Sequence, residues 1–118
     1  YYRKETIMKA IFFILKKKDL LDSLIEELKN NDITGGTIIE SKGMARAMVE
    51  TDEFAIFGAL RNLLNEEYKS TTTLLFVASP TKEKIILDSI EKICGKLDEP
   101  NTGILFALPV EYAKGIKF

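Results

Sequence analysis

The chain has 118 residues, of which 46% are hydrophobic and 30% are charged, as is typical of a single globular domain. A formal net charge of −1 provides no long-range attraction to nucleic acid or to an anionic membrane. There is no histidine and only one cysteine, so we expect no metal site of the zinc or copper type and no disulfide within the chain. No apolar run reaches the roughly 20 residues of a membrane span, and we expect a cytoplasmic protein.

The first part of the chain predicts a strand, a helix and a second strand. Residues 1–7 are an extension, a remnant of the expression vector or a lengthening of the first strand, which is predicted over Ile7–Leu15. A helix follows over Asp19–Lys29, with Asp19 as its predicted N-cap, and Asn30-Asn31-Asp32 ends it. The next strand is predicted over Ile33–Ser41.

A long insert, residues 42–70, follows the second strand. It has about thirty residues, whereas connections in compact domains usually have about 4–6, and connections this long are often functional. Apolar residues recur in it at helical spacing, which predicts an amphipathic helix. Its stripe packs on its own domain or binds a partner, and the candidate partner-binding residues are Ile56, Phe57, Leu60, Arg61 and Leu64.

The rest of the chain repeats the first pattern. A strand is predicted over Thr71–Ala78, a helix over Thr81–Cys94 and a strand over Gly103–Val110. Pro80 suits the start of that helix, Gly95 suits its end, and the lone Cys94 is predicted to be a core residue. The doubled pattern predicts an α+β domain over residues 1–118, a ferredoxin-like βαββαβ sandwich in which two helices cover one face of a four-stranded antiparallel sheet.

Three predicted strands are apolar on consecutive residues, namely Ile11–Leu15, Leu74–Val77 and Ile104–Leu108. Strands with one wet face usually alternate apolar and polar residues. Two helices cover only one face of such a sheet, so we expect other copies of the chain to cover the second face in a closed homo-oligomer. The alternative is that these runs reflect strand propensity alone.

Motifs of catalysis are missing from the sequence, and we expect that the protein is not an enzyme and has no catalytic residues. The basic Gly-aromatic strand motif of RNA-recognition domains is missing too. One set of residues is suited to anions: Gly43, Arg46 and Asn101-Thr102-Gly103 are expected at the ends of adjacent strands. Backbone N–H groups beside glycines, together with an arginine, can bind phosphate oxygens.

Two segments resemble the PII signal-transduction proteins. Residues 33–43 read I-T-G-G-T-I-I-E-S-K-G, which is similar to the family's second strand, V-T-G-M-T-V-x-E-V-x-G. Residues 102–111 are similar to its last strand, G-K-I-F-V-x-P-V-E. The resemblance covers nearly all of Met8–Ala113, and the insert corresponds to the family's T-loop.

This resemblance implies a ferredoxin-like homotrimer that binds ATP or ADP, often with 2-oxoglutarate, in clefts between subunits. It also implies a T-loop that docks on a transporter, an enzyme or a regulator of nitrogen metabolism. The effector-binding residues that it suggests are Gly35, Thr37, Gly43, Arg46, Asn101, Thr102 and Gly103.

The chain also departs from the family pattern. Ile104 stands where the family has a phosphate-binding lysine, and the arginines after the family's last strand fall near Gly115 and Lys117. Tyr68 is not in the context of the family's T-loop tyrosine. We therefore expect a divergent PII-like sensor of a small anionic effector, an adenine nucleotide bound more weakly than in the family, without uridylylation. A structural oligomerisation module without a ligand, and an enzyme on the same scaffold, are the alternatives.

Overall fold

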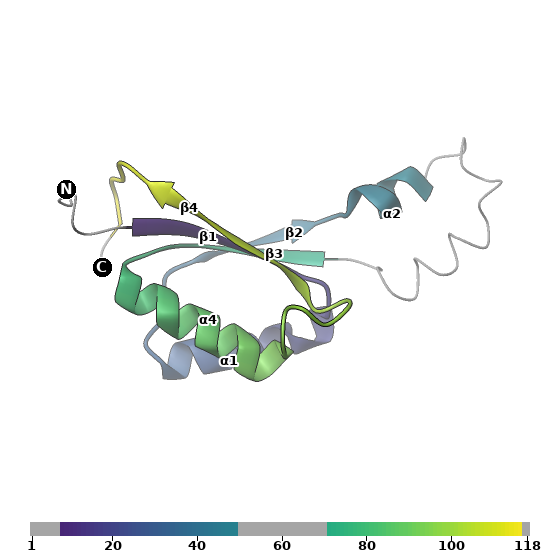
Figure 1. Ribbon diagram of the computed structural model, residues 1–118, viewed down its shortest axis with the longest axis horizontal. Coiled ribbons are helices and arrows are strands. Elements are labelled where there is room, and N and C mark those ends of the chain that lie inside the picture. Colours follow the sequence, from purple (N-terminus) through teal and green to yellow (C-terminus); the bar gives the residue numbers. More distant parts are fainter. Residues whose placement is uncertain (1–7, 50–70, 117–118) are drawn as a thin grey trace.

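The computed structural model describes residues 8–49 and 71–116. The described elements are β1 (Met8–Leu15), a 3-10 turn η1 (Lys18–Leu20), α1 (Leu21–Asn30), β2 (Thr37–Ser41), α2 (Met44–Val49), β3 (Thr71–Ala78), α4 (Pro80–Cys94) and β4 (Gly103–Val110). The four strands form one antiparallel sheet in the order β2-β3-β1-β4. Both long helices, α1 and α4, lie on the same face of this sheet (Figure 1). The predicted ferredoxin-like plan is confirmed.

Strand β1 lies inside the sheet, between β3 and β4. It pairs with β3 from Lys9↔Ala78 to Leu15↔Thr72 and with β4 from Met8↔Val110 to Leu15↔Gly103. Strands β2 and β4 are the two edges of the sheet. The ends of all four strands are therefore fixed relative to one another by three ladders of hydrogen bonds, the third of which pairs β2 with β3.

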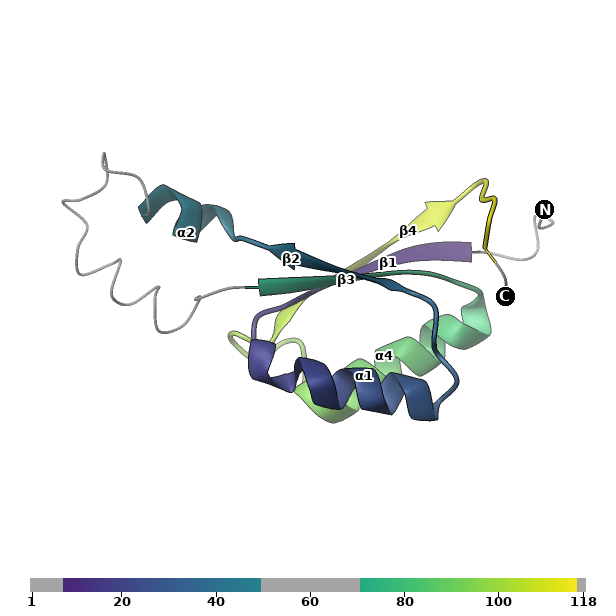
Figure 2. The ribbon, with the colours of Figure 1, turned by 180° about the vertical axis from the view of Figure 1, so that it is seen from behind.

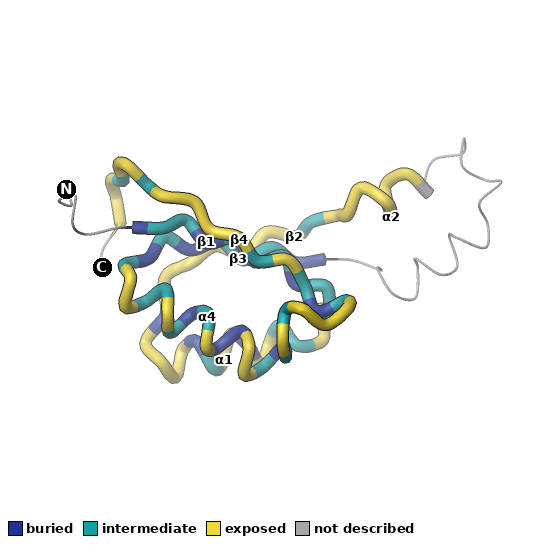
Figure 3. The backbone as a smooth tube through the Cα atoms, in the orientation of Figure 1, coloured by how far each residue is buried: buried dark blue, intermediate teal, exposed yellow. Residues whose placement is uncertain are grey.

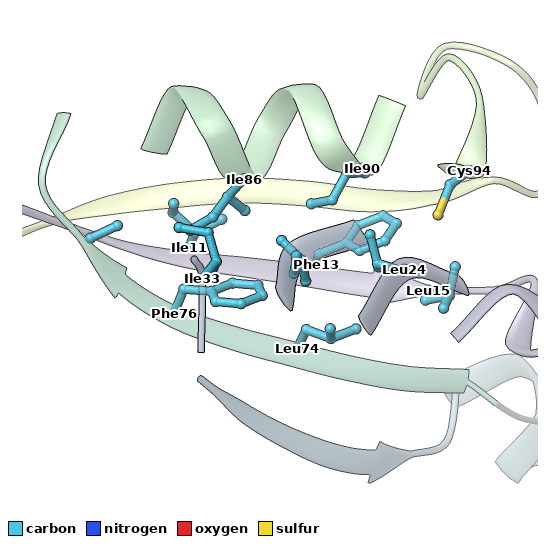
Figure 4. Close-up of a cluster of buried hydrophobic side chains, with 12 residues drawn as sticks. Ile11, Phe13, Leu15, Leu24, Ile33, Leu74, Phe76, Ile86, Ile90 and Cys94 are labelled. Atoms are coloured by element: carbon cyan, nitrogen blue, oxygen red, sulfur yellow. The ribbon is translucent and has the colours of Figure 1, made fainter. Parts of the chain in front are cut away.

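The core lies between the sheet and the two helices (Figure 4). Alternate residues of β1 point toward the helices, and Ile11, Phe13 and Leu15 are fully buried. Helix α4 contributes Ile90 and Cys94, among others. Burial raises the pKa of the Cys94 thiol, while Lys17 opposes this shift, and the predicted core role of Cys94 is confirmed.

The start of α1 differs from the prediction. Helix α1 begins at Leu21, and the preceding turn η1 contains Asp19. The N-cap residue of α1 is Leu20, without a side-chain hydrogen bond, so the prediction of Asp19 as N-cap is wrong. The reason is that the turn η1 precedes α1 and hydrogen-bonds its own backbone, with the Leu20 N–H donating to the Lys17 carbonyl at 2.9 Å.

The start of β2 was also predicted wrongly. The strand begins at Thr37 and not at Ile33, because the Ile33 N–H donates to the Leu28 carbonyl at 2.8 Å and so belongs to the end of α1. Ile33 still reaches the core, where it is buried. Pairing with β3 starts only at Thr37↔Leu75.

Both ends of α4 were predicted correctly. Pro80 is its first residue, and Gly95, with φ of 89°, is its C-cap. The hydroxyl of Ser79 caps the start by accepting from the Lys82 N–H at 3.5 Å.

A short helix, α2, begins immediately after Gly43 and was not predicted. Its first turn closes where the Ala47 N–H donates to the Gly43 carbonyl at 3.0 Å. Figure 2 shows β2 leading directly into α2, which lies beyond the end of the sheet and away from α1 and α4. The helix predicted around Ile56–Leu64 lies outside the described residues and stays a prediction.

Gly103 is required by the packing of β4 against β1. A Cβ atom there would lie 2.6 Å from the Ile14 carbonyl oxygen and 2.7 Å from the Phe13 ring. Backbone held in a ladder cannot move away, so we expect Gly103→Ala to lower the free energy of unfolding by about 1–3 kcal/mol. Chemical denaturation of this variant measures the loss, with Gly43→Ala as control, because a Cβ at Gly43 meets nothing within 4 Å. An unchanged midpoint for Gly103→Ala would contradict this packing.

Candidate functional site

The face of the sheet opposite the helices is apolar. It is formed by alternate residues of β1, β3 and β4, and the rings of Phe12 and Phe106 stack on it with centroids 4.9 Å apart. On β4, Ile104, Phe106 and Leu108 are 48%, 44% and 51% exposed. Figure 3 shows this exposure along β4, and among the described residues no helix lies over that face. The predicted second apolar face is thus present, and the described part of the chain places no helix over it (Figure 1).

Two of the predicted effector residues lie along the start of β2. Gly35 and Thr37 are exposed and line a pocket of about 400 Å³. Lys82 of α4 contributes the positive charge in this pocket, and Gly115, near which the resemblance placed one of the family's last arginines, also lines it.

Gly43 and Arg46 line a different pocket, of about 440 Å³, where β2 leads into α2. We call it the loop-base pocket, and its lining residues are Ile14, Lys16, Ser41, Lys42, Gly43, Met44, Ala45, Arg46, Thr71, Thr73 and Ile104. Three of these described residues, Lys16, Lys42 and Arg46, are cationic. The charge of the lining favours an anion.

The segment Asn101-Thr102-Gly103 lies at the same end of the sheet as Ser41 and leads into β4. The expectation that it ends a strand adjacent to β2 is wrong, because β2 and β4 are the opposite edges of the sheet with β3 and β1 between them. In the split βαβ arrangement, one strand of each repeat lies between the two strands of the other repeat. Strands β2 and β4 therefore lie at opposite edges of the sheet. The segment instead contacts the residue that follows β1, because the Lys16 N–H donates to the Thr102 carbonyl at 3.4 Å.

The predicted residues differ in how a ligand can reach them. The Thr102 side chain is fully buried, and its Oγ1 has no hydrogen-bond partner among the described residues, so only the backbone of Thr102 is a candidate contact. A Cβ at Gly35 or at Gly43 would meet nothing within 4 Å. The folded chain therefore does not itself require glycine at these two positions, in contrast to Gly103.

Five polar or charged lining residues of the loop-base pocket were not predicted as site residues, namely Lys16, Ser41, Lys42, Thr71 and Thr73. The register of β2 and β3 brings three of them together: Ser41 pairs with Thr71, and its Oγ lies 2.7 Å from Thr71 Oγ1 and accepts from Thr73 Oγ1 at 2.9 Å. The sequence does contain a signal for them, because Thr71 and Thr73 are two residues apart and so lie on one face of β3. This signal identifies a site only when the pairing register of β3 with β2 is known.

Comparison with known proteins supports the fold. No protein-family model matches the chain, and no curated protein sequence matches it. Among solved structures, PII of Arabidopsis thaliana bound to citrate is similar, with a TM-score of 0.59, 14% sequence identity, and coverage of 92% of this chain and 82% of that one. The likeness shows that this chain has a fold of the PII type. None of the described helices has the length and apolar character needed to cross a membrane.

Proposed function

We propose that the protein is a PII-like regulatory protein that senses a small anionic effector, an adenine nucleotide such as ATP or ADP, in a cleft between subunits. The observation that carries this proposal is the division of the effector residues into two groups. Gly35 and Thr37 line one pocket, while Gly43 and Arg46 line another. A cleft that uses both groups needs two copies of the chain.

The uncovered apolar face supports an assembly of this kind. Soluble monomers rarely expose a large contiguous apolar patch, and such a patch marks an interaction site. A homotrimer that places the three sheet faces inward covers it. Similarity in fold to a PII protein that binds citrate, itself a small anion, agrees with an anionic effector.

The insert over residues 42–70 is the proposed output element. Its candidate partner-binding residues, Ile56, Phe57, Leu60, Arg61 and Leu64, lie outside the described residues. We propose that they bind a transporter, an enzyme or a regulator of nitrogen metabolism, and that bound effector changes how far these loop residues are available to that partner. Hydrogen exchange of residues 54–64 with and without ADP tests this link. The proposal would be contradicted if these residues exchange equally fast in both conditions and if Phe57→Ser leaves partner binding unchanged.

We expect ATP or ADP to stabilise the protein and Arg46→Ala to abolish most of this effect. A ligand at one hundred times its dissociation constant stabilises the folded state by about 2.7 kcal/mol. The loss of one charge-assisted hydrogen bond costs about 1.5–3 kcal/mol of binding free energy. Thermal denaturation with a series of nucleotides, followed by calorimetric titration, measures both effects.

The control variant is Lys29→Ala, which removes one exposed positive charge from α1, outside both pockets. It should bind nucleotide as the native chain does. Tight ATP binding that Arg46→Ala leaves unchanged would contradict the proposed cleft. An absence of any nucleotide effect on the native protein would favour the structural oligomerisation module instead.

A further inference from the structure

We propose that the outer edge of β2 binds an extended segment of a partner protein, which adds to the sheet as a further strand. The segment has apolar residues at alternate positions and one basic residue in the same alternation. Backbone hydrogen bonds hold such a strand, and its alternate side chains decide whether it fits. This surface goes beyond the proposed function, because it uses the helix face of the sheet and no residue of the insert.

The outer edge of β2 is free in the described part of the chain. Strand β2 is an edge of the sheet and pairs with β3, from Thr37↔Leu75 to Ser41↔Thr71. Among the described residues, no backbone group forms a hydrogen bond with its other side. Proteins often block an exposed edge with lysine or proline, and the sequence of β2, T-I-I-E-S, contains neither. This edge can therefore accept a strand.

A groove lies beside this edge, on the face of the sheet that carries the helices. We call it the α1–β2 groove, and the residues that form it include Ile25, Leu28, Gly36, Ile38, Leu74 and Phe76. Its volume is about 100 Å³, whereas small-molecule sites have about 300–1,000 Å³, so it suits a side chain better than a cofactor. Its described lining is uncharged, and Ile25 and Ile38 are 38% and 49% exposed. An apolar side chain placed there would remove this surface from water.

Gly36 keeps the groove open next to the free edge. It has a φ of 148°, and a Cβ atom there would lie 3.0 Å from two atoms of the Phe76 ring. A side chain at this position would therefore require movement of Phe76, which belongs to the core. A partner strand has space opposite Gly36 for a second apolar side chain.

Two carboxylates lie toward one end of the groove. Glu40 lies on the same face of β2 as Ile38, because the residues opposite them on β3 are both buried. Asp22 precedes Ile25 by about one turn, and α1 runs antiparallel to β2 (Figures 1 and 2), which places Asp22 toward the same end. Both carboxylates are exposed, and neither forms an ion pair with a described residue. A basic side chain opposite Glu40 therefore forms a cross-strand pair of opposite charge, whereas Lys29, one turn after Ile25, disfavours a basic residue at the other end.

A second copy of the chain is a poorer occupant of this edge. Its own edge strands are β2 and β4. Strand β4, with the sequence G-I-L-F-A-L-P-V, has no charged residue, and the charged residue of β2 is Glu40 itself. Neither strand supplies a cation opposite Glu40, so the charge of the edge favours a different protein.

The test is fluorescence anisotropy of the 118-residue chain with a labelled peptide, T-R-T-V-T-V-T. In an antiparallel addition, its arginine lies opposite Glu40 and its two valines lie opposite Ile38 and Gly36. We expect T-E-T-V-T-V-T to bind at least tenfold more weakly, because it brings two carboxylates together. The peptide T-R-V-T-V-T-T, of the same composition as the first, should also bind at least tenfold more weakly, because its arginine and its valines point to opposite faces.

Two variants locate the site. Glu40→Lys should weaken T-R-T-V-T-V-T at least tenfold and bind T-E-T-V-T-V-T instead, whereas Ile25→Ser should weaken T-R-T-V-T-V-T about tenfold without this exchange of preference. Glu26→Lys is the matched control, since it makes the same change of charge at an exposed position of α1 outside the groove, and it should leave both affinities unchanged. Each variant should keep the native mass in sedimentation equilibrium.

Equal affinity for the arginine and glutamate peptides, or an equal loss in Glu26→Lys and Glu40→Lys, would overturn the inference. So would a lower mass of Ile25→Ser or Glu40→Lys, because the edge would then be an interface between copies. The outcomes are independent of the proposed function. ATP binding without any peptide binding overturns the inference alone, whereas peptide binding without any ATP binding supports the inference and contradicts the nucleotide as effector.

Discussion

Replacing Phe106 with aspartate is expected to reduce the mass of the assembled protein from about three times the 13.3 kDa chain to that of a single chain. Phe106 stacks on Phe12 in the middle of the uncovered sheet face and is itself 44% exposed. A monomer keeps the new carboxylate in water, whereas an assembly through this face buries it without a partner. Such burial costs several kcal/mol for each chain, which is enough to prevent association.

Sedimentation equilibrium at micromolar concentration measures this change. The matched control is Ile38→Asp, because Ile38 is similarly exposed but lies on the other face of the sheet, opposite Leu74. This control should keep the native mass. A native protein that sediments as a monomer, or a Phe106→Asp variant that keeps the native mass, would contradict an assembly through the open face.

The second large effect is expected from Ile104→Lys, which should tighten ATP binding by about one to two orders of magnitude. Ile104 lines the same pocket as Arg46 and Gly43, on the side of the open face. A lysine there adds one charge-assisted contact to a phosphate, worth about 1.5–3 kcal/mol, and a factor of ten in affinity corresponds to about 1.4 kcal/mol. It also restores the residue that the PII resemblance leads one to expect.

Calorimetric titration with ATP gives the affinity of this variant. Ser23→Lys adds the same charge at an exposed position of α1, outside both pockets and away from the open face, so it separates a local contact from a change in net charge. An affinity that is unchanged by Ile104→Lys, or raised equally by both lysines, would place the phosphates somewhere else.

The sheet and the two covering helices could be predicted because local and global signals agree there. The hydrophobic pattern predicted strands over Ile7–Leu15 and Thr71–Ala78, and the structure has β1 over Met8–Leu15 and β3 over Thr71–Ala78. Around α4, proline at the first position and glycine after the last are signals that act within one turn. Such signals need no knowledge of the rest of the fold.

The wrongly predicted element boundaries lie where backbone groups at the end of one element form hydrogen bonds that belong to its neighbour. Asp19 has the residue type of an N-cap, but a 3-10 turn precedes the helix and contains it. Ile33 has an apolar side chain that suits a strand, but its N–H completes the end of α1. Residue type alone does not decide such competition between neighbouring hydrogen bonds.

The candidate site was predicted in part, for a related reason. Gly43 and Arg46 lie together because they are close in sequence. The hydroxyl group of Thr73 and the side chain of Lys16 could join them only through the pairing of β2, β3 and β1, which a single sequence does not specify. The same pairing separates the ends of β2 and β4, which sequence reasoning had placed side by side.

One effector cleft is proposed to use residues of two chains, and mixing two defective variants tests this arrangement most directly. Arg46→Ala removes a cation of one pocket, and Thr37→Glu places an anion in the other, so each variant alone should lose ATP binding. After the two are unfolded together and reassembled in equal amounts, about a quarter of the clefts contain two native halves if assembly is random. Calorimetric titration of the mixture should therefore recover about that fraction of the native sites at native affinity. A mixture that assembles normally but recovers no binding, or a Thr37→Glu variant that binds ATP as the native chain does, would contradict a cleft shared between chains.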